Sequence, residues 1–241
     1  MIAAQAGLEV RTLARNGEQL LLTLIIPVLL LVVFSSEALI NVGRGSRIGF
    51  IAPGVLALAV LSTSFTSLAI GTAFERRYGV LKRLGATPLS RTGLIAAKAA
   101  TVLAVQAGQV VLIVAVSLLL GWRPVVTGVS VLSALAVLVI GSAAFSGLAM
   151  LMAGTLRAEA TLAGANLVYL VLLGIGGVVF PLTKFPAAAR PALLLLPSGA
   201  MSDGLRAVLR YGTGVPGKDL LVLAVWAIIG IGVAARTFRW E

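Results

Sequence analysis

The sequence predicts an all-α membrane protein, a single domain of 241 residues with six membrane-spanning helices. Hydrophobic residues make up 59% of the chain and charged residues only 11%, whereas soluble domains carry about 25% charged residues. The apolar residues form six runs that are long enough to cross a bilayer as helices. Several runs are longer than the roughly 20 residues that a span requires, which indicates tilted helices. These runs are residues 20–40, 50–74, 92–120, 125–156, 161–180 and 219–235.

The first 18 residues precede the first apolar run and mix apolar with charged side chains. Leu8 and Leu13 can face lipid while Glu9, Arg11 and Arg15 face water, a pattern typical of a helix lying in the membrane interface. A frayed polar terminus explains the pattern equally well. The segment lacks the short apolar core and small-residue cleavage site of a signal peptide.

Polar residues inside the runs are candidates for a path through the membrane. They include Ser64 and Thr66 in the second run, Gln106 and Gln109 in the third, and Asn166 with Tyr169 in the fifth. Each of them, taken alone, more often bonds across to a neighbouring helix, for about 0.6 kcal/mol. Glu37 lies near the outer end of the first run, where it either has a function or reaches the headgroups beside Arg44 and Arg47.

The most informative stretch is residues 75–91, between the second and third runs. Tyr78, Leu81 and Leu84 recur at three-residue spacing and predict one apolar helix face. The basic side chains that project elsewhere are Arg76, Arg77, Lys82 and Arg83. The pattern therefore predicts a short amphipathic helix on the cytoplasmic side.

This short helix is predicted to stop at a defined place. Gly85 suits a left-handed helix cap, and Pro88 prevents continuation. Gly79, in the middle of one face of this helix, lowers helix propensity by about 1 kcal/mol relative to Ala, which suggests that another backbone approaches it closely. A plain positive-inside loop is the alternative, but the cap and the stripe favour a docking helix.

Residues 181–218, between the fifth and sixth runs, predict a helical hairpin. The apolar stretch 192–196 is too short to cross a bilayer and is flanked by Pro191 and Pro197. Such a hairpin re-enters the membrane or lies on its surface, and any non-helical backbone at depth must be buried in protein or wetted.

Lysine and arginine predict the orientation. With both termini in the cytoplasm, 11 of the 19 Lys and Arg lie on the inner side, six of them between Arg76 and Lys98. That density favours cytoplasmic termini, whereas the basic residues between Lys184 and Lys218 argue against them.

Composition excludes several function classes. The chain has neither His nor Cys. This excludes disulfides, zinc or haem ligation by these side chains, and catalysis by a histidine or a thiol. No metal site is expected. The net charge is +11, and the basic residues lie beside the apolar runs. We therefore expect them to contact anionic lipid headgroups and not nucleic acid.

A glycine-rich segment from Gly212 to Asp219 comes close to a phosphate-binding loop. Asp219 stands where the loop needs a hydroxyl for Mg²⁺, no strand precedes it, and an apolar run follows. This chain is therefore not expected to bind ATP or any other cofactor itself.

The segment from Glu75 to Leu84, followed by Thr87-Pro88, resembles the cytoplasmic loop of type-2 ABC exporter permeases, close to the daunorubicin-resistance permease group. A second stretch resembles the outer helical hairpin of that family, although many relatives carry Asn-Pro where this chain has Leu196-Pro197. The residues that carry this second resemblance are Phe180-Pro181, Phe185-Pro186, Leu196-Pro197 and Asp203-Gly204-Leu205-Arg206.

The resemblance implies six spans, cytoplasmic termini and a dimer, either homodimeric or heterodimeric, in which each protomer engages a separate ABC ATPase that uses ATP and Mg²⁺. It implies that the ATPase is coupled through Glu75, Arg76, Tyr78, Gly79, Leu81, Lys82, Leu84 and Pro88. It also implies an extracellular hairpin bearing Phe180, Pro181, Pro186, Pro197, Asp203 and Arg206. Because the fifth span lines the route in the family, Asn166 and Tyr169 join Ser64 and Thr66 as substrate-path candidates.

The expected function is that of a non-catalytic permease subunit of an ATP-driven exporter in the cell membrane, moving an amphipathic drug-like or lipid-like compound outward. A glycan or a lipid-linked precursor is the alternative cargo. A secondary transporter is disfavoured because the runs hold almost no ionisable residues and no inverted repeat is visible. A membrane enzyme is disfavoured because no spacing among Ser, Lys, Asp and Glu suggests a nucleophile and its base.

Overall fold

The computed structural model describes residues 17–36, 46–80, 82 and 91–237, and throughout these residues the regular structure is helical, with no strand. The predicted all-α class is confirmed for this part of the chain. The helices are α2 (Gly17–Ser36), α3 (Arg47–Val60), the π-helix η1 (Leu61–Ser67), α4 (Leu68–Arg77), α6 (Arg91–Leu119), α7 (Gly128–Thr155), α8 (Ala158–Ile175), the 3-10 turn η2 (Leu182–Lys184), α9 (Arg190–Leu194), α10 (Pro197–Leu209) and α11 (Gly217–Thr237).

Five helices of the described residues are long and apolar enough to cross a membrane: Arg47–Arg77, Ala97–Leu119, Gly128–Thr155, Ala158–Ile175 and Gly217–Thr237. They coincide with the second to sixth predicted runs, which supports a multi-pass membrane protein. The first predicted run coincides with α2, whose described apolar part, Leu24–Ser35, is shorter than a span. The count of six spans therefore stays a prediction. Of the predicted interfacial helix, residues 1–16 lie outside the described residues, as does Glu37.

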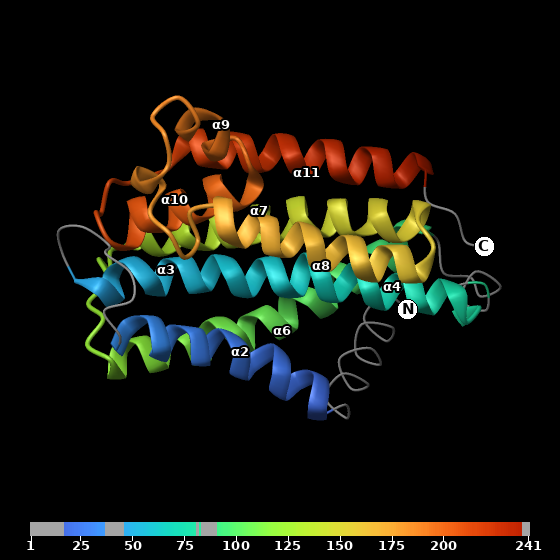
Figure 1. Cartoon of the computed structure of the whole chain (residues 1–241), viewed down its shortest axis with the longest axis horizontal. Helices are drawn as coiled ribbons and strands as arrows, with labels where there is room; N and C mark the ends of the chain where they lie inside the picture. The colour runs from blue at the N-terminus through green and yellow to red at the C-terminus, as the bar shows by residue number, and fades with distance from the viewer. Residues whose placement is uncertain (1–16, 37–45, 81, 83–90, 238–241) are drawn as a thin grey trace.

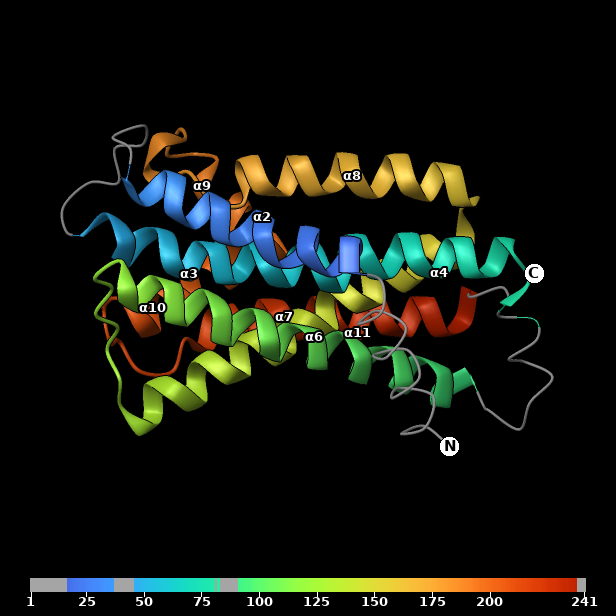
Figure 2. The same cartoon turned by 90° about the horizontal axis from the view of Figure 1, so that it is seen from below.

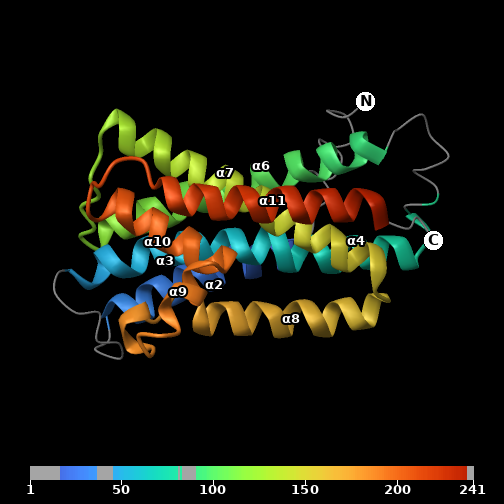
Figure 3. The ribbon, with the colours of Figure 1, turned by 90° about the horizontal axis from the view of Figure 1, so that it is seen from above.

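The helices run roughly side by side along the long axis of the molecule, with the continuous helix α3–η1–α4 at the centre (Figure 1). The apolar part of this central helix is 94% buried inside the protein, whereas the apolar parts of the other four spans are at most 44% buried. The helices α2 and α6 pack on α3, α8 packs on α4 and η1, and α7 with α11 forms a closely packed pair (Figures 2 and 3). We call the end with Arg77, Ala158 and Thr237 the α4 end, and the end with Arg47, Leu119 and Gly217 the α10 end.

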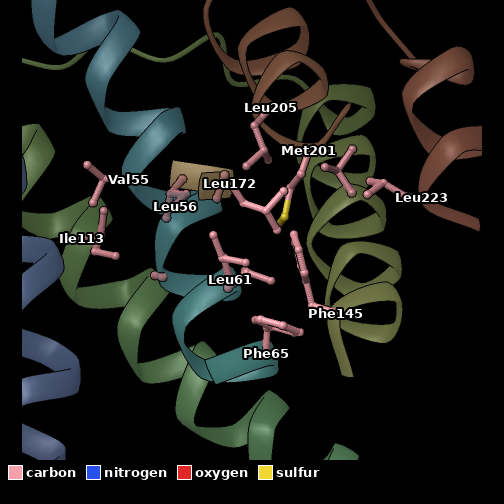
Figure 4. Close-up of a cluster of buried hydrophobic side chains, with 14 of the residues drawn as sticks. Val55, Leu56, Leu61, Phe65, Ile113, Phe145, Leu172, Met201, Leu205 and Leu223 are labelled. Carbon is pink, nitrogen blue, oxygen red and sulfur yellow. The ribbon is translucent and has the colours of Figure 1, made fainter. Parts of the chain in front are cut away.

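The core lies where the central helix meets α7 and α10. Figure 4 shows Leu61 and Phe65 of the central helix directed toward Phe145 and Met201. The rings of Phe65 and Phe145 are 6.5 Å apart and tilted by 58°, an arrangement that adds to simple burial. A Cβ at Gly141 would lie 2.9 Å from the sulfur of Met201, so a larger residue there would require the end of the Met201 side chain to shift.

The pair α7–α11 is held close by two glycines. A Cβ at Gly147 would lie 2.7 Å from the backbone nitrogen of Ile231, and a Cβ at Gly230 would lie 3.1 Å from the backbone of Gly147. Close backbone approach through small residues is the usual way in which membrane helices associate.

The fifth predicted run, 161–180, was wrong at its end. The helix α8 stops at Ile175, and residues 176–180 are bends. Gly177 has φ +68°, a left-handed conformation that helix-forming residues avoid. The hydroxyl of Ser202 donates to the carbonyl of Gly176 at 2.9 Å, so α10 occupies the space where α8 ends.

The segment from Leu182 to Leu209 forms the hairpin at the α10 end. The indole of Trp226 donates to the carbonyl of Leu195 at 2.8 Å. Trp226 lies nine residues into α11, which places the turn of the hairpin about 13 Å below the start of that helix. Pro197 is the first residue of α10. At that position a backbone N–H has no partner within the helix, so proline removes no helical hydrogen bond. The hairpin thus enters and leaves the bundle at one end.

Candidate functional site

The α4 end gathers polar contacts between helices. The ammonium of Lys98 on α6 lies 2.6 Å from Oε2 of Glu75, and the Lys98 side chain is 5% exposed against 33% for Glu75. Arg77 pairs with Glu159 in the first turn of α8. Arg76 donates to the carbonyl of Leu156, directly after α7. The last turn of α4 therefore contacts α6, α8 and the residue that follows α7 through polar side chains.

Gly79 does not have the place that the sequence pattern predicted. The helix α4 ends at Arg77, Tyr78 is its C-cap, and Gly79 follows with φ +71°. A continuous helix through residues 75–84 with Gly79 in its face is therefore wrong. Among the described residues, nothing lies within 4 Å of a Cβ built at Gly79. The left-handed backbone therefore favours glycine here, and no described neighbour requires it.

Beyond Gly79 the described part is brief. Val80 and Lys82 are helical, whereas Leu81, Leu84 and Pro88 lie outside the described residues. Tyr78 is 68% exposed and stacks on Phe74 at 6.1 Å between ring centroids. An exposed aromatic side chain at a helix end offers contact area to another surface.

A buried polar network crosses the middle of the bundle at η1. Thr63 donates to Oε1 of Gln109 at 2.8 Å, Gln106 donates to the hydroxyl of Ser64, and Ser142 on α7 donates to Oε1 of Gln106 at 2.6 Å. Such π-helical segments are rare and often mark functional positions. Ser64, Gln106 and Gln109 stood out from the sequence as polar residues within apolar runs, whereas Ser142, the π-helix and the pairing of these side chains did not.

The four predicted substrate-path residues do not meet at one point. Ser64 is fully buried and engaged with Gln106, and the hydroxyl of Thr66 is buried with no hydrogen-bond partner in the described part. Asn166 is exposed and donates to the carbonyl of Leu162 at 2.9 Å. Tyr169 packs against a small cluster with Leu58 and Val178. Their role in a path remains a prediction.

Arg206 holds the α10 end together. It is 5% exposed and donates to the carbonyls of Gly177 at 2.6 Å, Val178 at 2.8 Å and Phe50 at 3.2 Å. Its guanidinium lies 3.7 Å above the ring of Phe50. Burial lowers the pKa of Arg206 to about 9, while the nearby charge of Asp203 opposes this shift. Arg206 is therefore still charged at neutral pH, and it compensates the carbonyls that the bend after α8 leaves without helical partners.

The other predicted hairpin residues lie around this bend. Pro181 and Pro197 are buried, while Phe180, Pro186 and Asp203 are exposed. The glycine-rich segment before α11 is a turn, and Lys218 with Asp219 already belongs to the first turn of α11.

A family profile described as ABC-2 type transporter matches residues 7–209 of the chain. The chain belongs to the ABC-2 type transporter family. The match extends from before α2 through α10, so it includes both the segment at residues 75–91 and the hairpin. Membership makes the chain a permease subunit of an ABC transporter, and ABC-2 permeases in general work with an ABC ATPase. No curated protein matches the chain.

Proposed function

We propose that this ABC-2 permease exports an amphipathic drug-like or lipid-like compound across the cell membrane, powered by a separate ATPase that binds ATP and Mg²⁺ and docks at residues 75–88. The permease itself is non-catalytic, works as a homodimer or heterodimer, and has both termini in the cytoplasm. The family match carries the proposal, and the daunorubicin-resistance group is the subgroup whose motifs the chain resembles.

The contacts at the α4 end support the position of the docking site. Glu75 and Arg77 are fixed by partners on α6 and α8, while Tyr78 projects outward. A partner that grips Tyr78 and the following residues would therefore move helices of the bundle and not a loose loop.

The chemistry of the interior supports an apolar or amphipathic cargo and a separate energy source. A cavity between α4, α6, α7 and α11 has walls that are almost entirely hydrocarbon, which suits an amphiphile better than a glycan. Among the described residues no Asp or Glu is fully buried, whereas proton-coupled transporters rely on such groups.

The test is co-purification of the tagged chain with candidate ABC ATPases in detergent. We expect one ATPase to co-purify in a stoichiometric complex and its ATP hydrolysis to be altered by the permease. A well-folded permease that retains none of the ATPases and transports without ATP would contradict the proposal.

The proposed orientation predicts where single cysteines react, and the native chain contains no cysteine. In Ala188→Cys the exposed thiol at the α10 end should react with a membrane-impermeant maleimide on intact cells. In Ala160→Cys, an exposed position in the first turn of α8 at the α4 end, reaction should need permeabilised cells. The reverse pattern would invert the orientation.

A further inference from the structure

A cavity of about 150 Å³ lies between α4, α6, α7 and α11. Its walls include Leu68, Val102, Met150 and Ala234. On α7 it extends over residues 139–150, a length of about 16 Å along the helix. An engineered apolar cavity of about this volume in a soluble protein binds benzene and stays dry, so hydrocarbon is the natural content.

The cavity opens sideways, through the surface that faces lipid. Three of its lining side chains are also exposed: Leu103 by 40%, Val139 by 50% and Ile231 by 41%. All three belong to helices of membrane-spanning length. A hydrocarbon chain from the surrounding bilayer can therefore enter without passing through the protein.

The end of the cavity toward the α4 end lies beside the ion pair of Lys98 and Glu75. Lys98 lines the cavity, whereas its partner Glu75 does not. The other polar groups on the wall are the hydroxyls of Ser142 and Ser146. The hydroxyl of Ser142 is already bonded to Gln106. The ammonium of Lys98, paired with Glu75, thus lies at one end of a hydrocarbon-walled cavity, and an anionic head that takes the place of this carboxylate would leave its apolar tail in the cavity.

We propose that this cavity binds part of one acyl chain of an anionic phospholipid of the bilayer, with the lipid phosphate at Lys98 and the rest of the chain in the surrounding lipid. Basic pockets between membrane helices are a recurring way to bind anionic headgroups. The phosphate competes with Glu75 for the ammonium, so lipid binding loosens the link between α4 and α6. The site shares the cavity that supports the proposed cargo, but its test measures lipid retention without an ATPase or transport, so failure of the lipid site and failure of the proposed export give different results.

The test is native mass spectrometry of the purified full chain, titrated with phosphatidylglycerol or phosphatidylcholine carrying identical acyl chains. We expect the native chain to retain one phosphatidylglycerol with about fivefold preference, the effect of one lysine near anionic lipid. Lys98→Gln should remove the preference. Ala99→Leu, which fills the cavity, should lose the bound lipid, while Ala100→Leu on the exposed neighbouring position should behave as the native chain.

Equal retention of both lipids by the native chain, or an unchanged preference in Lys98→Gln, would overturn the proposal. So would displacement of the lipid by glycerol phosphate, since that would assign the site to soluble phosphates. If Lys98→Gln fails to fold, Glu75→Gln decides: without the competing carboxylate, the preference for phosphatidylglycerol should rise severalfold. No rise would equally count against the site.

Discussion

Transport is expected to fall at least tenfold in Gly79→Trp and to persist in Gly79→Asn. Gly79 holds a left-handed backbone, φ +71°, directly after α4. A left-handed conformation costs most L-residues about 1–2 kcal/mol, but asparagine adopts it readily. Tryptophan should therefore redirect the chain after Tyr78 and misplace the docking segment. Transport in cells, together with co-purification of the ATPase, measures both effects.

The asparagine variant separates two explanations of why glycine stands at this position. If another backbone approached Gly79 closely in the complex, asparagine would be as harmful as tryptophan. If only the backbone conformation matters, as the absence of a close neighbour among the described residues indicates, asparagine should keep at least half of the activity. Membrane insertion should be equal in all three proteins, and normal transport by Gly79→Trp would exclude this segment as the coupling element.

Arg206→Met is expected to lower the thermal unfolding midpoint by about 10 °C. Three backbone carbonyls accept from Arg206, and leaving one buried acceptor without its donor costs about 1–3 kcal/mol. In a protein of this size 1 kcal/mol corresponds to about 2–4 °C. Differential scanning fluorimetry in detergent measures the midpoint.

Arg210→Met is the matched control for this prediction. Arg210 lies directly after α10 and its guanidinium is 5.7 Å from the ring of Phe50, but it is only half-buried. Its replacement should shift the midpoint by less than a third as much. Equal shifts in the two variants would show that general charge at this end stabilises the protein, and that the carbonyl contacts of Arg206 do not.

The long helices were predictable because a run of apolar residues enters a helix in lipid whatever its neighbours are. The predicted runs 92–120 and 219–235 agree with α6 and α11 to within two residues. The end of α8 was not predictable in this way, since residues 176–180 are as apolar as a helix interior. They bend because Gly177 adopts a left-handed backbone conformation. Arg206, 29 residues later in the chain, stabilises the bend by donating a hydrogen bond to the carbonyl of Gly177.

The candidate site was predicted only in part. The charged residues at Glu75–Arg77 stood out from the sequence, but their partners Lys98, Leu156 and Glu159 did not, because each lies on a different helix. Gly79 was predicted to be a site of close backbone approach, whereas it ends the helix α4. The sequence alone does not distinguish a glycine that ends a helix from a glycine that allows close packing.

The sequence by itself determined the membrane class, the helical content, the absence of histidine and cysteine chemistry and, through two short motifs, the family. These depend on composition and on residues that are neighbours along the chain. Only the tertiary structure decided the π-helix with its polar network, the bend held by Arg206, the ion pair of Lys98 and the cavity beside it. Each of these forms between side chains that are far apart in sequence, and hydropathy says nothing about which buried polar groups will meet.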